Sequence, residues 1–156
     1  MAEAGYTAYE ISNFAQDGEA CKHNRGYWLY DDYIGIGAGA AGKWDTSNGG
    51  VLRYSNIRSP STYIEAALQH GLAVNSDEDL RADQAMGEAV WLGLRQNQGI
   101  DLNWFKLRFD QPLLEAYPVL VQQWQSQGHL EVVAQHLRLT STGLSLADDI
   151  SASFLF

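Results

Sequence analysis

Residues 34–43 read Ile-Gly-Ile-Gly-Ala-Gly-Ala-Ala-Gly-Lys, and this stretch of small residues contains two nucleotide-binding patterns at once. The spacing of Gly37, Gly39 and Gly42 is G-x-G-x-x-G, the dinucleotide fingerprint. With Lys43, two of the same glycines give most of a P-loop. The residues on either side decide whether this is a phosphate site or another use of glycine.

Neither pattern has the context that its chemistry needs. A dinucleotide fingerprint opens a helix whose N-terminus holds the pyrophosphate, but residues 44–50 are rich in turn formers. A P-loop needs a serine or threonine after its lysine to bind magnesium, and Trp44 stands there instead. The glycines are therefore expected to let the backbone approach something closely, either another strand or a ligand.

Outward from the glycines, periodicity and turn signals predict an α+β fold. Short strands are expected at 8–11, 32–36 and 51–54, with an irregular loop over 13–32 that contains one helical turn near Trp28. Ser59, Pro60 and Gly71 delimit a helix. Further helices are expected at 75–95 (capped by Asn75 and Glu78), 102–109, 113–124 (split at Pro118) and 141–152 (capped by Thr140 or Ser141), with a hairpin at 130–139.

The net charge argues against polyanionic partners. The 156 residues carry 19 acidic side chains against 10 lysines and arginines, which gives a net charge of −9. Affinity for nucleic acid depends on cationic contacts with phosphate, so the winged-helix-like order of elements after residue 103 does not indicate DNA binding. Anionic membrane surfaces are disfavoured for the same reason. We find neither a transmembrane-length apolar run nor a signal peptide.

Cysteine usage suggests a compartment and excludes one cofactor. The single cysteine, Cys21, cannot form an internal disulfide, so a reducing cytoplasm is expected. One thiolate also cannot hold an iron–sulfur cluster, which needs three or four. A hydrophobic content of 46% with 12% aromatic residues predicts a folded core.

The segment around the glycines resembles a known family. Residues 5–44 are similar to the later part of HemW-type proteins, the HemN-like branch of the radical S-adenosylmethionine (SAM) enzymes. The resemblance rests on Tyr9-Glu10-Ile11-Ser12-Asn13-Phe14-Ala15, on His23-Asn24-Arg25-Gly26-Tyr27-Trp28 and on Asp32-Tyr33-Ile34-Gly35-Ile36-Gly37-Ala38-Gly39-Ala40. The H-N-x-x-Y-W sextet distinguishes the HemW branch from true coproporphyrinogen dehydrogenases. The likeness continues through Arg53-Tyr54-Ser55-Asn56, Leu92-Gly93-Leu94-Arg95 and Leu139-Thr140-Ser141-Thr142-Gly143-Leu144, and so covers almost the whole chain.

The resemblance implies an organisation for the chain. Residues 1–72 would be the end of a radical SAM barrel with linking strands, and residues 73–156 a mostly helical, winged-helix-like domain of the HemN C-terminal type. HemW-type proteins carry their C-x-x-x-C-x-x-C motif in an upstream barrel. The chain would then be a C-terminal portion that lacks this N-terminal barrel, and by itself would neither bind a [4Fe–4S] cluster nor cleave SAM. One departure is Ala41, where the family often has histidine.

The resemblance also implies a role in heme metabolism. HemW-type proteins are regarded as heme chaperones, which bind heme or porphyrin and pass heme to acceptor proteins. Heme contact is then expected from the sextet residues His23, Asn24, Tyr27 and Trp28. An imidazole is the commonest protein ligand of heme iron, the two aromatic rings could stack on a porphyrin, and the asparagine could orient the histidine or bind a propionate. The residues expected to line the cofactor cavity are Glu10, Asn13, Gly35, Gly37, Ala38 and Gly39.

Two other functions stay open at this point. The chain could be a fragment of an oxygen-independent coproporphyrinogen III oxidase of porphyrin biosynthesis, inactive without its barrel. It could instead be a structural module that caps the barrel, in which Tyr27 and Trp28 only pack and His23 bonds a backbone carbonyl. A chain without its barrel would also expose strand edges and apolar surface, which favours a homodimer.

Overall fold

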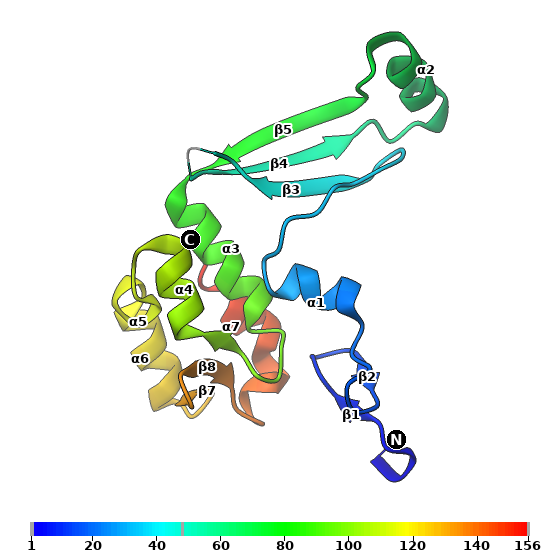
Figure 1. Cartoon of the computed structure of the whole chain (residues 1–156). Coiled ribbons are helices and arrows are strands. Elements are labelled where there is room, and N and C mark those ends of the chain that lie inside the picture. The colour runs from blue at the N-terminus through cyan, green and yellow to red at the C-terminus, as the bar shows by residue number, and fades with distance from the viewer. Residues whose placement is uncertain (1, 48, 156) are drawn as a thin grey trace. The chain divides into compact units, whose positions relative to one another are not determined.

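The computed structural model describes residues 2–47 and 49–155, which form two compact units. One unit contains the residues before Asp31 together with those from Met86 onward, and the other contains Asp31–Ala85. Both units combine helices with strands (Figure 1), which confirms the expected α+β class. The predicted domain boundary after residue 72 concerns a longer protein and stays a prediction, whereas the compact units divide after residues 30 and 85.

The unit Asp31–Ala85 is built on an antiparallel sheet with the strand order β3–β4–β5. Its elements are β3 (Ala41–Asp45), β4 (Val51–Asn56), α2 (Pro60–His70) and β5 (Val74–Leu80). The strand expected at 51–54 is confirmed within β4. The strand expected at 32–36 is wrong: within that segment only Tyr33 pairs, with Lys43, and the ladder with β4 begins at Ala41.

Local signals determine both ends of α2, as expected from the sequence. Ser59 is the N-cap residue and Pro60 occupies the first turn, where its missing N–H costs no hydrogen bond. The helix ends at Gly71, which adopts the left-handed conformation with φ 72°. Glycine takes this conformation without the steric penalty that a Cβ would bring.

The long helix expected at 75–95 is wrong in its first part. The residues of β5 pair with β4 instead, and across this pair Glu78 accepts a hydrogen bond from Arg53 at 2.9 Å. Helix α3 begins only at Ala82 and ends at Gly93. The capping pattern of Asn75 and Glu78 is therefore overridden, because a neighbouring strand satisfies the backbone of these polar residues.

The other unit has its core around the second half of α3. Its fully buried side chains include Val90, Leu94, Phe105, Ile150 and Phe154, each at most 1% exposed. Burial of one such side chain stabilises the fold by about 1.5–3 kcal/mol before the entropic cost is counted. Burial of these five side chains, which come from α3 and the residue that follows it, from α4, from α7 and from the C-terminal segment, therefore brings distant parts of the chain into one core.

Short elements surround that core. They are β6 (Ile100–Asp101), α4 (Leu102–Phe109), α5 (Leu113–Ala116), α6 (Pro118–Ser126), β7 (Leu130–Val133), β8 (His136–Leu139), η2 (Gly143–Leu146) and α7 (Ala147–Ala152). The helix at 102–109, the break at Pro118 and the hairpin are confirmed, and β6 extends the hairpin into a sheet of order β6–β8–β7. The last helix begins later than expected, because residues 143–146 form η2 first, where Gly143 N donates a hydrogen bond to Thr140 Oγ1 at 3.1 Å.

The N-terminal segment adds η1 (Ala2–Ala4) and a small hairpin of β1 (Thr7–Ala8) and β2 (Phe14–Ala15). The strand expected at 8–11 is confirmed only at its start, although Glu10 forms an isolated bridge with Gln96. Within the irregular loop expected over 13–32, the helical turn expected near Trp28 is confirmed, but it belongs to a longer helix, α1 (Lys22–Trp28). None of the helices in the described part of the chain has the length and apolar character needed to cross a membrane.

Candidate functional site

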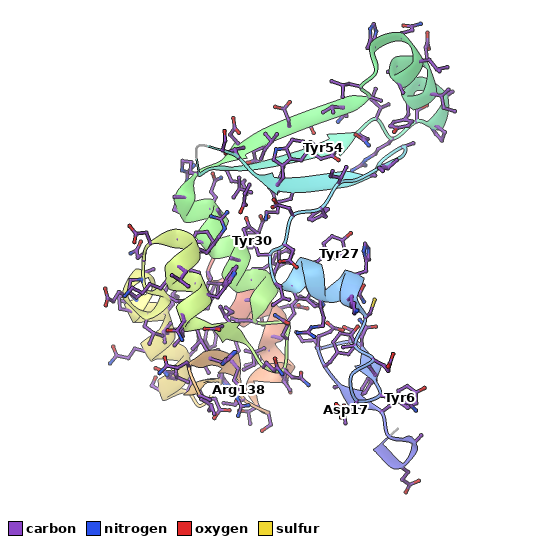
Figure 2. All side chains as sticks on the ribbon, in the orientation of Figure 1. Tyr6, Asp17, Tyr27, Tyr30, Tyr54 and Arg138 are labelled. Atoms are coloured by element: carbon purple, nitrogen blue, oxygen red, sulfur yellow. The ribbon has the colours of Figure 1, made fainter. Side chains whose placement is uncertain are left out.

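His23 and Tyr27 form one face of helix α1. The Nε2 atom of His23 lies 3.2 Å from the Tyr27 hydroxyl, and the rings meet edge to face with centroids 4.9 Å apart. Residues four apart share one side of a helix, which explains why this pair forms. His23 is exposed and Tyr27, labelled in Figure 2, is half-buried. The sextet therefore presents an imidazole beside a phenol at the surface of α1.

Trp28 lies on a different side of α1. At about 100° of rotation per residue, Trp28 is turned by about 140° from His23. The Trp28 ring packs against Arg95, whose guanidinium carbon lies 4.9 Å from the ring centroid. Asn24 is half-buried and, being four residues earlier, shares the Trp28 side. The structure thus brings His23 and Tyr27 together without bringing Trp28 to their face, and heme contact by all four residues stays a prediction.

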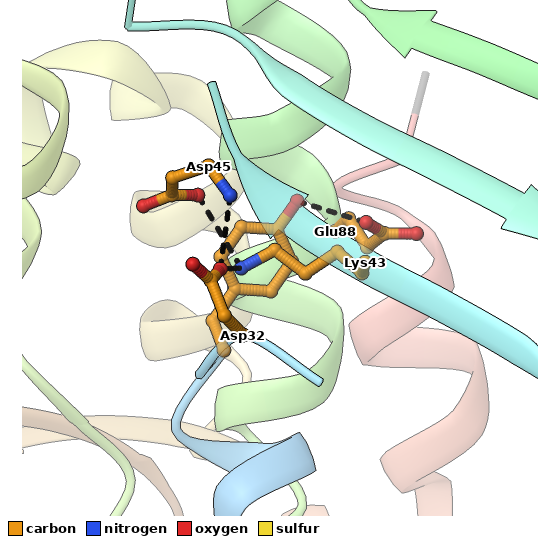
Figure 3. A network of polar contacts seen from close by, with 5 residues as sticks. Asp32, Lys43, Asp45 and Glu88 are labelled. Carbon is orange, nitrogen blue, oxygen red and sulfur yellow. Dashed lines mark hydrogen bonds and ion pairs between the residues drawn. The ribbon is translucent and has the colours of Figure 1, made fainter. Parts of the chain in front are cut away.

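Two long-range hydrogen bonds hold the C-terminal end of α1 against α3 and its following turn. Gln96 Nε2 donates to the Trp28 carbonyl oxygen at 3.3 Å, and the Tyr30 hydroxyl donates to Glu88 Oε2 at 2.8 Å (Figure 3). Tyr30 is buried with φ 62°, a conformation that costs a non-glycine residue about 1–2 kcal/mol. The sequence did not predict the contacts of Tyr30 with Glu88 and of Trp28 with Arg95, although Arg95 belongs to the stretches that carry the resemblance, because no local pattern connects positions so far apart.

Glu10 and Asn13, predicted to line a cofactor cavity, are in direct contact. Asn13 Nδ2 donates to Glu10 Oε1 at 2.6 Å, and Ser12 N donates to the same oxygen at 2.8 Å. Glu10 is only 1% exposed, and its Oε2 atom has no hydrogen-bond partner among the described residues. A buried carboxylate oxygen without a donor is costly, so this atom is suited to accept a hydrogen bond from a bound group. The cavity-lining role stays a prediction.

The glycines lie in a second candidate segment, residues 33–43, which we call the glycine loop. The bridge between Tyr33 and Lys43 closes this loop. Gly35 N donates to the Tyr54 hydroxyl at 2.8 Å, and that hydroxyl donates to Gly35 O at 3.0 Å (Figure 2 labels Tyr54). A Cβ atom at Gly35 would lie 2.1 Å from the Ala41 oxygen. Glycine is needed here because two segments of the chain itself approach closely.

The next residues of the glycine loop are also held by the chain. Gly37 N donates to the Tyr63 hydroxyl at 3.2 Å, and Gly39 N donates to Ile57 O at 3.0 Å. Both glycines have positive φ, 106° and 72°, which glycine adopts without penalty. Ala38 between them is exposed. The proposed roles of Gly35, Gly37, Ala38 and Gly39 in lining a cofactor cavity stay predictions.

Lys43 ends the glycine loop and is held by two carboxylates. Its side chain is 3% exposed, with Nζ 3.0 Å from Asp32 Oδ1 and 3.4 Å from Asp45 Oδ1 (Figure 3). A buried ammonium group is stable only with such partners, because it has lost its hydration. The lysine of the P-loop-like pattern therefore already has anionic partners within the protein.

The residues present fit a heme iron better than an iron–sulfur cluster. Among the described residues, no three His, Cys, Asp or Glu side chains are grouped to hold a metal ion. Cys21 is a free, exposed thiol, and one thiol cannot supply the ligands of a cluster. Heme iron needs only one or two axial ligands from the protein, and the exposed imidazole of His23 meets that need.

Sequence comparisons connect the chain to proteins of known family. The model of the HemN C-terminal domain matches residues 80–146. The chain is 33% identical to the heme chaperone HemW of Mycobacterium tuberculosis (strain ATCC 25618 / H37Rv) and 30% identical to that of Lactococcus lactis (strain IL1403). Both matches cover 99% of this chain, but 36% and 39% of the relatives. The similarity therefore extends well beyond the domain model, into the segment that holds the sextet and the glycine loop.

The fold is similar to that of a solved structure. Coproporphyrinogen III oxidase (HemN) from Escherichia coli, described as a radical SAM enzyme, matches with a TM-score of 0.71 over 98% of this chain and 38% of that one. The sequence identity is 16%, so this likeness shows the fold alone. The chain is therefore similar over almost its whole length to HemW heme chaperones and contains a match to the HemN C-terminal domain, and it spans about 40% of the length of the curated relatives it matches.

Proposed function

We propose that the chain is the heme-binding C-terminal part of a HemW-type heme chaperone. The observation that carries this proposal is the exposed His23–Tyr27 pair, in a chain whose relatives, matched over 99% of its length, are named heme chaperones. The chain spans only part of those relatives, so delivery of heme to an acceptor protein is proposed for the intact protein. We place this function in the cytoplasm, where an exposed thiol such as Cys21 stays reduced.

In this proposal His23 supplies the axial ligand of the iron. Its Nε2 atom lies 3.2 Å from the Tyr27 hydroxyl, so iron binds at Nε2 only after that contact opens, or binds at Nδ1 instead. An exposed hydrogen bond of this kind contributes about 0.5–1.5 kcal/mol, and an iron–imidazole bond outweighs it. A phenol beside the ligand, such as Tyr27, would suit a propionate as a hydrogen-bond donor and a porphyrin as an aromatic neighbour.

The other predicted residues have supporting roles in the proposal. Asn24 orients the imidazole or binds a propionate. Trp28 stacks on the macrocycle only if the end of α1 rearranges, because Arg95 covers the indole ring and the two hydrogen bonds to α3 and its turn restrain it. Glu10 and the glycine loop line the cofactor cavity of the intact protein. In the intact protein, a [4Fe–4S] cluster and SAM would be bound by residues outside this chain, because the single thiol of this chain cannot hold a cluster.

The proposal includes contacts with other chains. Ile34 and Ile36 in the glycine loop are 75% and 86% exposed, and Leu68 of α2 is 83% exposed. Exposed apolar side chains of this kind are typical of interaction surfaces. A homodimer through these residues predicts a concentration-dependent mass in light scattering. A constant monomer mass up to millimolar chain concentration would contradict it.

Heme titration tests the proposed ligand. Hemin added to the chain should produce a saturable shift of the Soret band, and His23→Ala should abolish it. His70→Ala is the matched control, because His70 is an equally exposed histidine at the end of α2. If both variants bind as the unmodified chain does, His23 is not the ligand. If both lose binding, the shift reports surface histidines in general.

The same proteins distinguish the alternative functions. An intact protein that converts coproporphyrinogen with SAM would be an oxidase, and the chaperone proposal would fail. An intact protein that transfers bound heme to an apo-acceptor, without such turnover, supports the chaperone. If neither heme binding nor turnover is found, the chain is a structural module that caps the barrel.

A further inference from the structure

A pocket behind α1 shares Trp28 with the proposed heme contacts but contains none of the other three residues, His23, Asn24 and Tyr27. It has a volume of about 230 Å³, and all its lining residues belong to the unit that contains α1 and the part of α3 from Met86 onward. Its walls come from the end of α1, from α3, β6, α4 and β8. They include Trp28, Leu29, Ala89, Ile100, Trp104 and His136. Two indoles and aliphatic groups make the pocket mainly apolar.

The small residues around the pocket keep it open. Ala89 lines it with a single methyl group and is buried, and Gly93 and Gly99 add no side chain. A Cβ atom at Gly93 would lie 2.5 Å from Ile100 Cγ1, so that glycine lets α3 approach the strand after it. The volume exceeds that of an engineered apolar cavity of about 150 Å³, which binds benzene. One aromatic ring with a small substituent therefore fits, whereas a porphyrin does not.

Trp28, one of the lining residues, carries a buried polar atom that has no partner in the described residues. Trp28 Nε1 is buried without a hydrogen bond, although indole N–H groups usually find an acceptor when they are buried. Leaving such a donor unpaired costs stability, so an occupant that accepts a hydrogen bond gains affinity. His136 is suited to accept: its Nδ1–H group donates to the Ala134 carbonyl at 3.0 Å, which leaves Nε2 as an acceptor when the ring is neutral.

We propose that this pocket is a binding site for a small molecule with a single aromatic ring and a hydrogen-bond acceptor, which receives the Trp28 indole N–H. The ring lies among Trp28, Trp104 and Ile100. The acceptor, such as a carbonyl oxygen, reaches Trp28 Nε1. The site shares Trp28 with the proposed heme contacts, but it does not include the proposed iron ligand His23, which lies on another side of α1. An occupant would contact α1 only through Trp28 and Leu29.

Two fluorinated probes test this site on the complete chain. The first, 4-fluoroacetophenone, has the ring and the acceptor, and the second, 1-ethyl-4-fluorobenzene, has nearly the same shape without the acceptor. Fluorine NMR titration should give an affinity about three- to tenfold higher for the ketone, the range expected for one hydrogen bond. In ¹H–¹⁵N spectra the indole N–H signals of Trp28 and Trp104 should shift. The signal of Trp124, whose Nε1 donates to Ser153 Oγ at 3.1 Å, should not.

Two variants make the test decisive. Trp28→Phe keeps a ring but removes the donor, so the preference for the ketone should fall to about onefold while the hydrocarbon still binds. Ala89→Leu fills the pocket and should abolish binding of both probes. If the ketone preference survives in Trp28→Phe, or if no indole signal moves at saturating probe, the assignment is wrong. Because Trp28→Phe changes no backbone contact, it keeps the proposal testable even if Ala89→Leu fails to fold.

Discussion

Tyr54→Phe tests how the glycine loop is held. The substitution removes only a hydroxyl, which accepts from Gly35 N at 2.8 Å and donates to Gly35 O at 3.0 Å. Gly35 O keeps a second donor, Asn56 Nδ2 at 3.2 Å, so the N–H group is the one left without a partner. Loss of a partly buried pair of this kind is expected to lower the free energy of unfolding by about 1–2 kcal/mol.

Urea unfolding, followed by the indole N–H signal of Trp44, measures the effect of Tyr54→Phe. The Trp44 ring lies 5.1 Å from the Tyr54 ring, and the phenyl ring of the variant preserves this packing. The urea midpoint should fall with an unchanged m-value. Tyr63→Phe is the control: it loses one longer bond, to Gly37 N at 3.2 Å, and should lose less stability. Equal stability of Tyr54→Phe and the unmodified chain would refute the proposed fixation of Gly35.

Three further substitutions follow from the contacts. Gly35→Ala should lower the free energy of unfolding in urea by more than about 2 kcal/mol, because its Cβ would lie 2.1 Å from the Ala41 oxygen. The control Gly49→Ala, with φ 83° and no atom within 4 Å of its Cβ, should lower it by only about 1–2 kcal/mol. Equal losses of stability in the two variants would contradict the close approach at Gly35. Asp101→Ala should lower the free energy of unfolding by about 1 kcal/mol, because Asp101 Oδ1 caps α4 by accepting hydrogen bonds from Asn103 N and Trp104 N. Asp101→Asn keeps an acceptor at this position and should retain most of the stability in thermal unfolding. The hydrogen bond from Arg81 lowers the pKa of Asp83 in the folded state. The stability that this exposed pair contributes is therefore fully present above the unfolded-state pKa of aspartate, about 3.9. That stability is lost as the pH falls through the lower folded-state pKa. Asp83→Asn should therefore slightly lower the melting temperature at pH 7 and have no effect at a pH below that folded-state pKa; a difference that persists in acid would contradict this sign.

Where local chemistry decides an element, the sequence was enough to predict it. Helix α2 lies between Ser59-Pro60 and Gly71, and the break before α6 falls at Pro118, because capping and proline act within one turn. β5 was mistaken for helix because its polar residues carry a capping pattern. Its pairing is decided by β4, whose residues lie 18 to 29 positions earlier in the sequence, and no local pattern reports such a pairing.

The candidate site shows the same limit. The contact between His23 and Tyr27 follows from their spacing once a helix is assumed, but the asparagine and glycine of the sextet suggested a loop. Residues far away in the sequence stabilise the helix: the Tyr30 hydroxyl donates a hydrogen bond to Glu88, and the Trp28 ring packs against the Arg95 guanidinium. For the glycine pattern, close approach to the chain itself is confirmed at Gly35 and Gly42, whereas close approach to a cofactor stays a prediction. Which partner each glycine approaches required the positions of Tyr54 and Ala41.

The central claim is that His23 on α1 ligates heme iron, and resonance Raman spectroscopy of the reduced heme complex tests it most directly. The account predicts an iron–imidazole stretching band that shifts when the protein is labelled with ¹⁵N-histidine. The band should be absent in His23→Ala and unchanged in His70→Ala. An unchanged band in His23→Ala, or a heme complex with no histidine-dependent band at all, would contradict the claim.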